Sequence, residues 1–191
     1  MKYLALLLLG LLGAGQAGAD WDYMTVDAAD GVPLQVVTAG RREQPAIIFI
    51  HGIGQSHYSF HRQFNSDLAE DFFLVAFDLR GHGASGKPWT PDAYENSAVW
   101  ARDVAAVIKA TQARQPILVA WSYGTLVAMD YIREFGVADI AGLNMTGALG
   151  ALRPFRMPAT DDPATEEFAR IRELQLSPNL VDNIRASELM V

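Results

Sequence analysis

A serine after an apolar run is the residue of this sequence best suited to covalent chemistry. Ile117 to Ala120 is uncharged and apolar, Ser122 follows, and the next segment has the apolar spacing of a helix. A sharp strand–turn–helix junction exposes a serine hydroxyl and requires small residues two positions before and after it. Ala120 and Gly124 meet that requirement. The pattern predicts a nucleophile, whereas an isolated match of this kind would indicate only a serine that caps a helix.

A second candidate is the segment His51-Gly52-Ile53-Gly54, which follows the apolar run Ala46 to Ile50. Two glycines let the backbone turn sharply and leave its N–H groups unshielded, as binding of an oxyanion requires. His51 is a tempting catalytic residue, but we interpret it as a structural hydrogen-bonding group inside the loop. No cofactor or metal site is predicted.

The third candidate, Asp78 to Ser85, follows the apolar run Phe72 to Phe77. Its glycines, continued to Gly86, also spell a dinucleotide-binding G-x-G-x-x-G pattern. That interpretation requires a helix to begin on the loop and receive the pyrophosphate. Lys87 to Pro91 follows instead, with two prolines and no helical spacing. We therefore reject nucleotide binding and expect Asp78 and Arg80 to order this loop through an ion pair or backbone hydrogen bonds, without catalytic roles.

The elements that must position these candidates are short apolar strands separated by amphipathic helices. The expected strands are 46–50, 72–77, 117–120 and 140–145, preceded by a hairpin of 25–26 and 34–38 around Asp30-Gly31. Runs that do not alternate with polar residues are typical of strands covered on both faces of a parallel sheet. Helical apolar spacing joins Phe60, Phe64 and Leu68, then Ala101, Val104, Ala105 and Ile108, then Leu126, Met129 and Ile132. The alternation predicts an α/β protein with a doubly wound, mostly parallel sheet.

The motifs, in this order, resemble the α/β-hydrolase fold family from about residue 25 to residue 146. The resemblance implies that Ser122 is the nucleophile and that the backbone N–H groups of Ile53 and Tyr123 bind the oxyanion. It also implies a substrate pocket bordered by His51, Gly52, Gly54 and Trp121. The expected reaction is acyl transfer to water from a small carboxylic ester. Carbon–carbon bond hydrolases and cofactor-free perhydrolases share the serine and stay open, whereas the family's epoxide hydrolases and haloalkane dehalogenases use an aspartate.

The sequence departs from the family in one respect that concerns catalysis. The family's triad runs Ser, then Asp or Glu, then His along the chain. The four histidines of this sequence, His51, His57, His61 and His82, all precede Ser122. We expect the acid and the base beyond Val191, with the last strands of the sheet, and the 191-residue chain to be almost inactive. The rival interpretation is a naturally short, non-catalytic binding or scaffold relative.

The remaining sequence indicates the domain organisation and the cell compartment. Lys2, the apolar run Tyr3 to Leu12 and Ala17-Gly18-Ala19 indicate an export signal cleaved after Ala19. We expect residues 1–19 to be this signal, 20–152 an incomplete hydrolase core, and 153–191 the start of a lid. The mature protein would be periplasmic or secreted, and membrane-bound only if the signal is retained. A net charge of −7 without a basic cluster argues against nucleic acid as a partner. The resemblance implies a small-molecule substrate.

Overall fold

The structure is a computed structural model that describes residues 20–149. Beyond them it describes residues 166, 169–171, 173–174, 177, 179, 181–182 and 185. The predicted export signal, residues 1–19, lies outside the described residues, as does most of the predicted lid segment, 153–191. Residues 153–191 form a compact unit distinct from residues 1–152. Two of its described stretches, 169–171 and 173–174, are helical.

The first unit is organised around one sheet of six strands in the order β1-β2-β4-β3-β5-β6. The strands are β1 (Asp22–Asp27), β2 (Pro33–Ala39), β3 (Ala46–Ile50), β4 (Phe73–Phe77), β5 (Ile117–Trp121) and β6 (Gly142–Thr146). β1 and β2 form the predicted antiparallel hairpin, and β2 is also antiparallel to β4. From β4 onwards all pairs are parallel. The predicted fold class, an α/β protein with a mostly parallel sheet, is confirmed.

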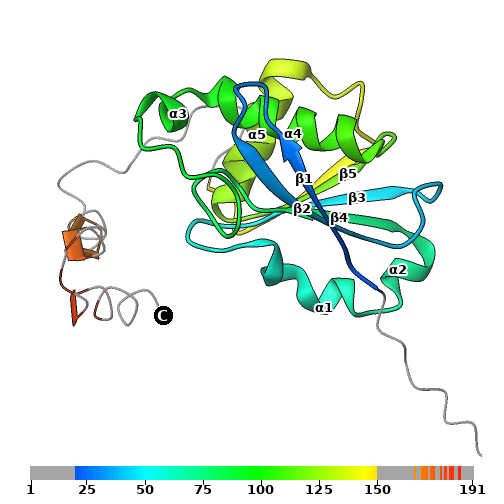
Figure 1. Ribbon diagram of the computed structural model, residues 1–191, viewed down its shortest axis with the longest axis horizontal. Helices are drawn as coiled ribbons and strands as arrows, with labels where there is room; N and C mark the ends of the chain where they lie inside the picture. Colours follow the sequence, from blue (N-terminus) through cyan, green and yellow to red (C-terminus); the bar gives the residue numbers. More distant parts are fainter. Residues whose placement is uncertain are drawn as a thin grey trace, which may run out of the picture. The chain divides into compact units, whose positions relative to one another are not determined.

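Helices cover both faces of this sheet (Figure 1). The helical segments are η1 (His57–Phe60), α1 (His61–Phe64), α2 (Leu68–Asp71), α3 (Asp92–Glu95), α4 (Ser97–Thr111) and α5 (Tyr123–Phe135). Figure 1 shows α4 and α5 over one face and α1 and α2 over the other. None of the helices among the described residues is long and apolar enough to cross a membrane.

The core explains why the strand runs do not alternate. All five residues of β3 are buried. Ile48 and Ile50 belong to the apolar cluster under α4 and α5, whereas Ile47 and Phe49 belong to the cluster under η1, α1 and α2. Successive side chains of a strand point to opposite faces, so a strand covered on both sides needs an apolar residue at every position.

The segment after β3 differs from the single helix that its spacing predicts. Phe60 and Phe64 are buried as expected, but the chain forms η1, α1 and α2 in succession. Ser66 accounts for the break, because its hydroxyl donates to the carbonyl oxygen of Gln63 and accepts from the N–H of Leu68. Such local bonds compete with the helical ladder.

The buried face of α5 is broader than the spacing of its apolar residues predicts. The sequence spacing places Leu126, Met129 and Ile132 on the core side. Met129 is buried and Ile132 packs against the core cluster, as expected, and Val127, Ala128 and Tyr131 are buried in that cluster as well. Helix α5 lies against both the sheet and α4. Because both of these sides of α5 are covered, the spacing of apolar residues does not show the full extent of its buried surface.

Candidate active site

Ser122 lies on a strained turn between β5 and α5. Its backbone angles are φ 52° and ψ −120°, a region that residues with a side chain rarely occupy. The neighbouring strand β6 holds this turn, because the N–H of Ser122 donates to the carbonyl oxygen of Thr146 at 2.9 Å. Its carbonyl oxygen accepts from the hydroxyl of Thr125 at 2.6 Å. A strained serine held at a strand–helix junction is the geometry of an exposed nucleophile.

The small residues around Ser122 are required by close packing. A Cβ atom at Gly124 would lie 2.3 Å from the carbonyl oxygen of Ile50, at the end of β3. Ala120 is fully buried on the other side of the turn. Gly52 completes the arrangement, because a Cβ there would lie 3.2 Å from Cβ of Ser122 and 3.3 Å from the ring of Trp121. The loop after β3 therefore lies directly against the serine.

The two backbone groups expected to bind an oxyanion belong to Ile53 and Tyr123. In the part of the chain from 20 to 149, neither N–H donates a hydrogen bond to a protein acceptor. The side chain of Ile53 is 61% exposed, whereas the ring of Tyr123 packs edge-on against Trp100 at 5.6 Å. Burial raises the pKa of the Tyr123 phenol. Tyr123 therefore faces the core with its ring and can contribute through its backbone.

His51 is fully buried and both of its ring nitrogens are bonded. Nδ1 lies 2.7 Å from the carbonyl oxygen of Gly52, and Nε2 accepts from the N–H of Leu79 at 3.0 Å. A carbonyl oxygen only accepts and an amide N–H only donates, so Nδ1 carries the proton and the ring is neutral. Burial lowers the pKa of His51 to about 4, against the opposing effect of the Gly52 bond. This geometry gives His51 a structural role and does not support the pocket-lining role implied by the resemblance.

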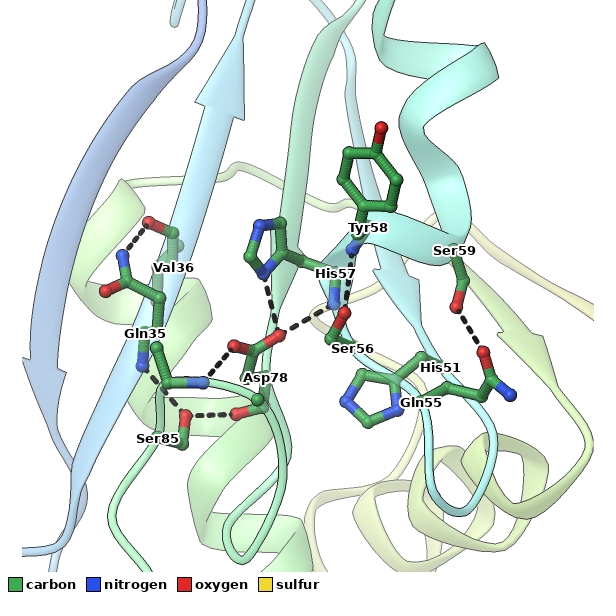
Figure 2. A network of polar contacts seen from close by, with 12 residues as sticks. Gln35, Val36, His51, Gln55, Ser56, His57, Tyr58, Ser59, Asp78 and Ser85 are labelled. Carbon is green, nitrogen blue, oxygen red and sulfur yellow. Dashed lines mark hydrogen bonds and ion pairs between the residues drawn. The ribbon is translucent and has the colours of Figure 1, made fainter. Parts of the chain in front are cut away.

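Asp78 organises the loops after β3 and β4 (Figure 2). One carboxylate oxygen accepts from the backbone N–H of His57 and contacts its Nδ1, both at 2.7 Å, and the other accepts from the N–H of Ala84 at 2.7 Å. Burial alone would raise the pKa of this carboxyl group, but these hydrogen bonds outweigh it, so the pKa lies below its usual value. Asp78 thus joins the two loops through backbone hydrogen bonds and not through an ion pair with Arg80.

Arg80 pairs with two carboxylates that lie far from it in the sequence. The guanidinium, 1% exposed, forms a bidentate pair with Asp103 of α4 and a second pair with Asp30 of the β1–β2 turn. Its remaining N–H donates to the carbonyl oxygen of Ala93 at 3.0 Å. All five guanidinium donors are therefore satisfied. Neither carboxylate is predicted from the sequence, and the only signal is that Asp103 occupies a buried position in a helical pattern.

Within the described residues no hydrogen bond joins a histidine to Oγ of Ser122. His51 is bonded on both nitrogens. The other three each use Nδ1 in a local contact, His57 with Asp78, His61 with the carbonyl of Tyr58, and His82 with that of Arg80. Within the described residues no cluster of His, Cys, Asp or Glu could hold a metal ion. This part of the chain therefore contains the candidate nucleophile and the candidate backbone donors, and no histidine hydrogen-bonded to Ser122.

Comparison with known proteins extends the fold assignment to a family. A family model described as alpha/beta hydrolase fold matches residues 45–188. The crystal structure of a putative aryl esterase from Burkholderia cenocepacia superposes with a TM-score of 0.67 at 33% identity, covering 88% of this chain and 67% of that one.

Two relatives with curated descriptions match over shorter regions. The AB hydrolase superfamily protein YisY of Bacillus subtilis is 35% identical over 102 residues, 53% of this chain and 37% of its own length. Epoxide hydrolase A of Mycobacterium tuberculosis is 27% identical over 139 residues, 73% of this chain and 41% of its own. The chain spans about two fifths of these two relatives.

Proposed function

The chain belongs to the alpha/beta hydrolase fold family, and on that premise we propose that it is a serine hydrolase that transfers the acyl group of a small carboxylic ester to water. The observation that carries the proposal is the backbone of Ser122, held at φ 52° and ψ −120° between β5 and α5. Backbone strain of about 1–3 kcal/mol persists only where the surroundings enforce it, and such positions cluster at active sites.

In the proposed reaction, Oγ of Ser122 attacks the ester carbonyl carbon and the alcohol leaves. Water then hydrolyses the acyl-enzyme and regenerates the serine. The negative charge on the carbonyl oxygen is stabilised by the N–H groups of Ile53 and Tyr123. Each such donor contributes about 2.7–4 kcal/mol to stabilisation of the transition state. The contact between Gly52 and Ser122 supports this assignment, because it holds the donor loop against the nucleophile.

The base and the acid would come from residues beyond Val191. The edge position of β6 supports this part of the proposal, since β6 is the last strand in the sheet order of the described residues. Beside it lies an apolar hollow of about 540 Å³, whose lining includes Ile132, Ile140, Leu143 and Met145. An uncharged strand edge next to an apolar hollow is a surface that folded proteins cover with a further strand or helix.

The comparisons include an epoxide hydrolase as well as an esterase, so a second reaction has to be weighed. The family's epoxide hydrolases use an aspartate that forms an alkyl ester with the ring-opened substrate. We assign Ser122 to the nucleophile position, where a serine would supply an alkoxide for acyl transfer. We therefore favour ester hydrolysis. Carbon–carbon bond hydrolysis and perhydrolysis, which share the serine, are the alternatives within the family, and a non-catalytic binding module is the alternative outside it.

A fluorophosphonate probe tests the proposal on the 191-residue chain. Loss of triad members leaves about 10³–10⁴-fold catalysis over water from the oxyanion site and binding. Ser122 of the folded protein should therefore be labelled slowly but selectively, and faster than in the urea-unfolded chain. Ser122→Ala should abolish the label, and Ser97→Ala, the same change on the exposed first turn of α4, should not. Equal labelling of the folded and unfolded chains at Ser122 would refute the serine hydrolase assignment.

A further inference from the structure

A hollow of about 460 Å³ opens beside the loop that follows β3. We call it the Gln55 hollow, after one of the side chains that line it, which are Gln55, Ser56, Tyr58, Ser59 and His61. They come from the end of that loop, from η1 and from the first residue of α1. The volume is within the range of about 300–1,000 Å³ that ligand sites occupy.

Two side chains of the Gln55 hollow have hydrogen-bond donors that are available to a ligand. The hydroxyl of Ser59 donates to Oε1 of Gln55 at 3.1 Å, which fixes the amide (Figure 2). The amide nitrogen of Gln55 then has no protein acceptor among the described residues. Oγ of Ser56 accepts from the N–H of Tyr58 at 3.3 Å and keeps its own proton available. Both groups can donate to a ligand.

The same hollow also offers an acceptor. Nδ1 of His61 lies 3.0 Å from the carbonyl oxygen of Tyr58, and in the tautomer that donates to this carbonyl Nε2 is an acceptor. The ring of Tyr58 stacks on that of His61 at 4.8 Å and 10°, which holds the imidazole plane. Donors and an acceptor therefore surround one hollow.

The charge of the lining narrows the chemistry of the ligand. Within the described part of the chain, no Lys, Arg, Asp or Glu lines the hollow. A carboxylate or phosphate group would lack a cation, and an ammonium group would lack a carboxylate. A neutral group that both donates and accepts, such as an alcohol hydroxyl, fits the set of Gln55, Ser56 and His61.

The hollow is within reach of the nucleophile. Gly54, which also borders it, follows Gly52 by two residues. Two residues span at most about 7 Å. Gly52 itself lies against Ser122, as shown by the 3.2 Å approach of a Cβ atom there. Gly54, at the border of the Gln55 hollow, is therefore close enough to Ser122 for a substituent several bonds long on a bound ester to reach it.

We propose that the Gln55 hollow is a substrate subsite that binds a neutral, hydroxyl-bearing substituent, so that the substrate is an ester of a polyol or of a hydroxylated acid. The proposal rests on the serine hydrolase function. It names the substrate class that this site would select.

Titration of the ¹⁵N-labelled 191-residue chain with four neutral esters tests the proposal. Glycerol monoacetate carries its hydroxyls on the alcohol side and methyl glycerate on the acyl side. Butyl acetate and methyl butanoate are the matched esters without hydroxyls. One hydroxylated ester should shift the amide signals of Gln55 and Ser59 and bind at least ten-fold more tightly than its matched ester. Whether that ester is glycerol monoacetate or methyl glycerate shows whether the hollow binds the alcohol half or the acyl half of the substrate.

Variants of the residues that line the Gln55 hollow distinguish specific hydrogen bonding of the ester from nonspecific binding. Gln55→Leu should weaken binding of that ester at least five-fold, and His61→Phe, which retains a ring to stack on Tyr58, should weaken it as well. Gln63→Leu makes the same change on an exposed part of α1 and should leave binding unchanged. Equal binding of the hydroxyl-free esters, or no effect of Gln55→Leu, would overturn the subsite. Ser122 labelling is measured separately. If the hydroxylated esters do not bind selectively but Ser122 is still labelled, the subsite is rejected and the serine hydrolase assignment stands.

Discussion

Gly124 lies directly against the carbonyl oxygen of Ile50, to which a Cβ atom would approach within 2.3 Å. The contact joins the first turn of α5 to the end of β3, and it therefore sets how closely the nucleophile turn and the donor loop approach each other. Backbone atoms on both sides leave no flexible side chain to move aside.

Gly124→Ala should therefore destabilise the protein and misplace Ser122. Overpacking of this kind costs about 1–3 kcal/mol, and urea denaturation should show a loss in that range together with loss of Ser122 labelling. Gly142→Ala is the control, because nothing lies within 4 Å of a Cβ at that position. A stable Gly124→Ala variant with normal labelling would contradict the packing argument.

Ser122→Gly should be more stable than Ser122→Ala, despite the greater flexibility of unfolded glycine. Glycine adopts the φ of 52° without strain, whereas alanine retains the cost of about 1–3 kcal/mol. The expected difference in unfolding free energy, measured by urea denaturation, is about 1 kcal/mol in favour of glycine. The same pair of substitutions at Ser97, in the first turn of α4, should give the opposite sign because helical glycine is unfavourable.

His51 should make the stability fall as the pH is lowered from about 6.5 towards 4. Its pKa drops from 6.5 to about 4 on folding because burial disfavours the charged ring. The unfolded chain thus binds more protons in that window, and stability rises with pH by up to about 1.4 kcal/mol per unit for one such group. His51→Gln should reduce the slope measured by urea denaturation between about pH 4.5 and 7.5. An unchanged slope would mean that the buried ring does not titrate on unfolding.

Arg80→Met should cost about 3–5 kcal/mol, because it leaves the buried carboxylate of Asp103 without its cation. Arg80→Lys should also be destabilised, since an ammonium group lacks the five-donor geometry of the guanidinium. Arg114→Met, at an exposed position just after α4, provides the matched control. Thermal and urea unfolding measure all three, and a loss below about 1 kcal/mol for Arg80→Met would argue against the structural role of the pairs that Arg80 forms with Asp30 and Asp103.

The edge of β6 should make the 191-residue chain self-associate. Met145 on this strand is 38% exposed, and no charged residue occurs in β6. A charge on an edge strand opposes pairing with a second copy, so Met145→Lys should shift the sedimentation velocity distribution towards monomer. Tyr23→Lys on the opposite edge strand, where Asp22 and Asp27 already supply charge, should have little effect. Equal self-association of both variants would locate the contact elsewhere.

Local sequence determined the elements and the family resemblance. The apolar run Ala46 to Ile50 coincides with β3 and Ile117 to Ala120 with most of β5, because a strand buried on both faces must be apolar throughout. The expected helix over Phe60 to Leu68 is interrupted between α1 and α2, because the hydrogen bonds of Ser66 are a local feature that periodicity does not detect.

The residues around Ser122 show how far sequence alone reaches at the site. Small residues at 120 and 124 predicted a tight turn, since the turn geometry is encoded within a few neighbouring positions. Only the tertiary structure identified the carbonyl of Ile50 as the group that excludes a larger residue at 124. It also decided that His57 is the partner of Asp78 and that Asp30 and Asp103 are the partners of Arg80. Such pairs join residues 21 to 50 positions apart, and contact between distant residues follows from how the elements pack, which no local pattern encodes.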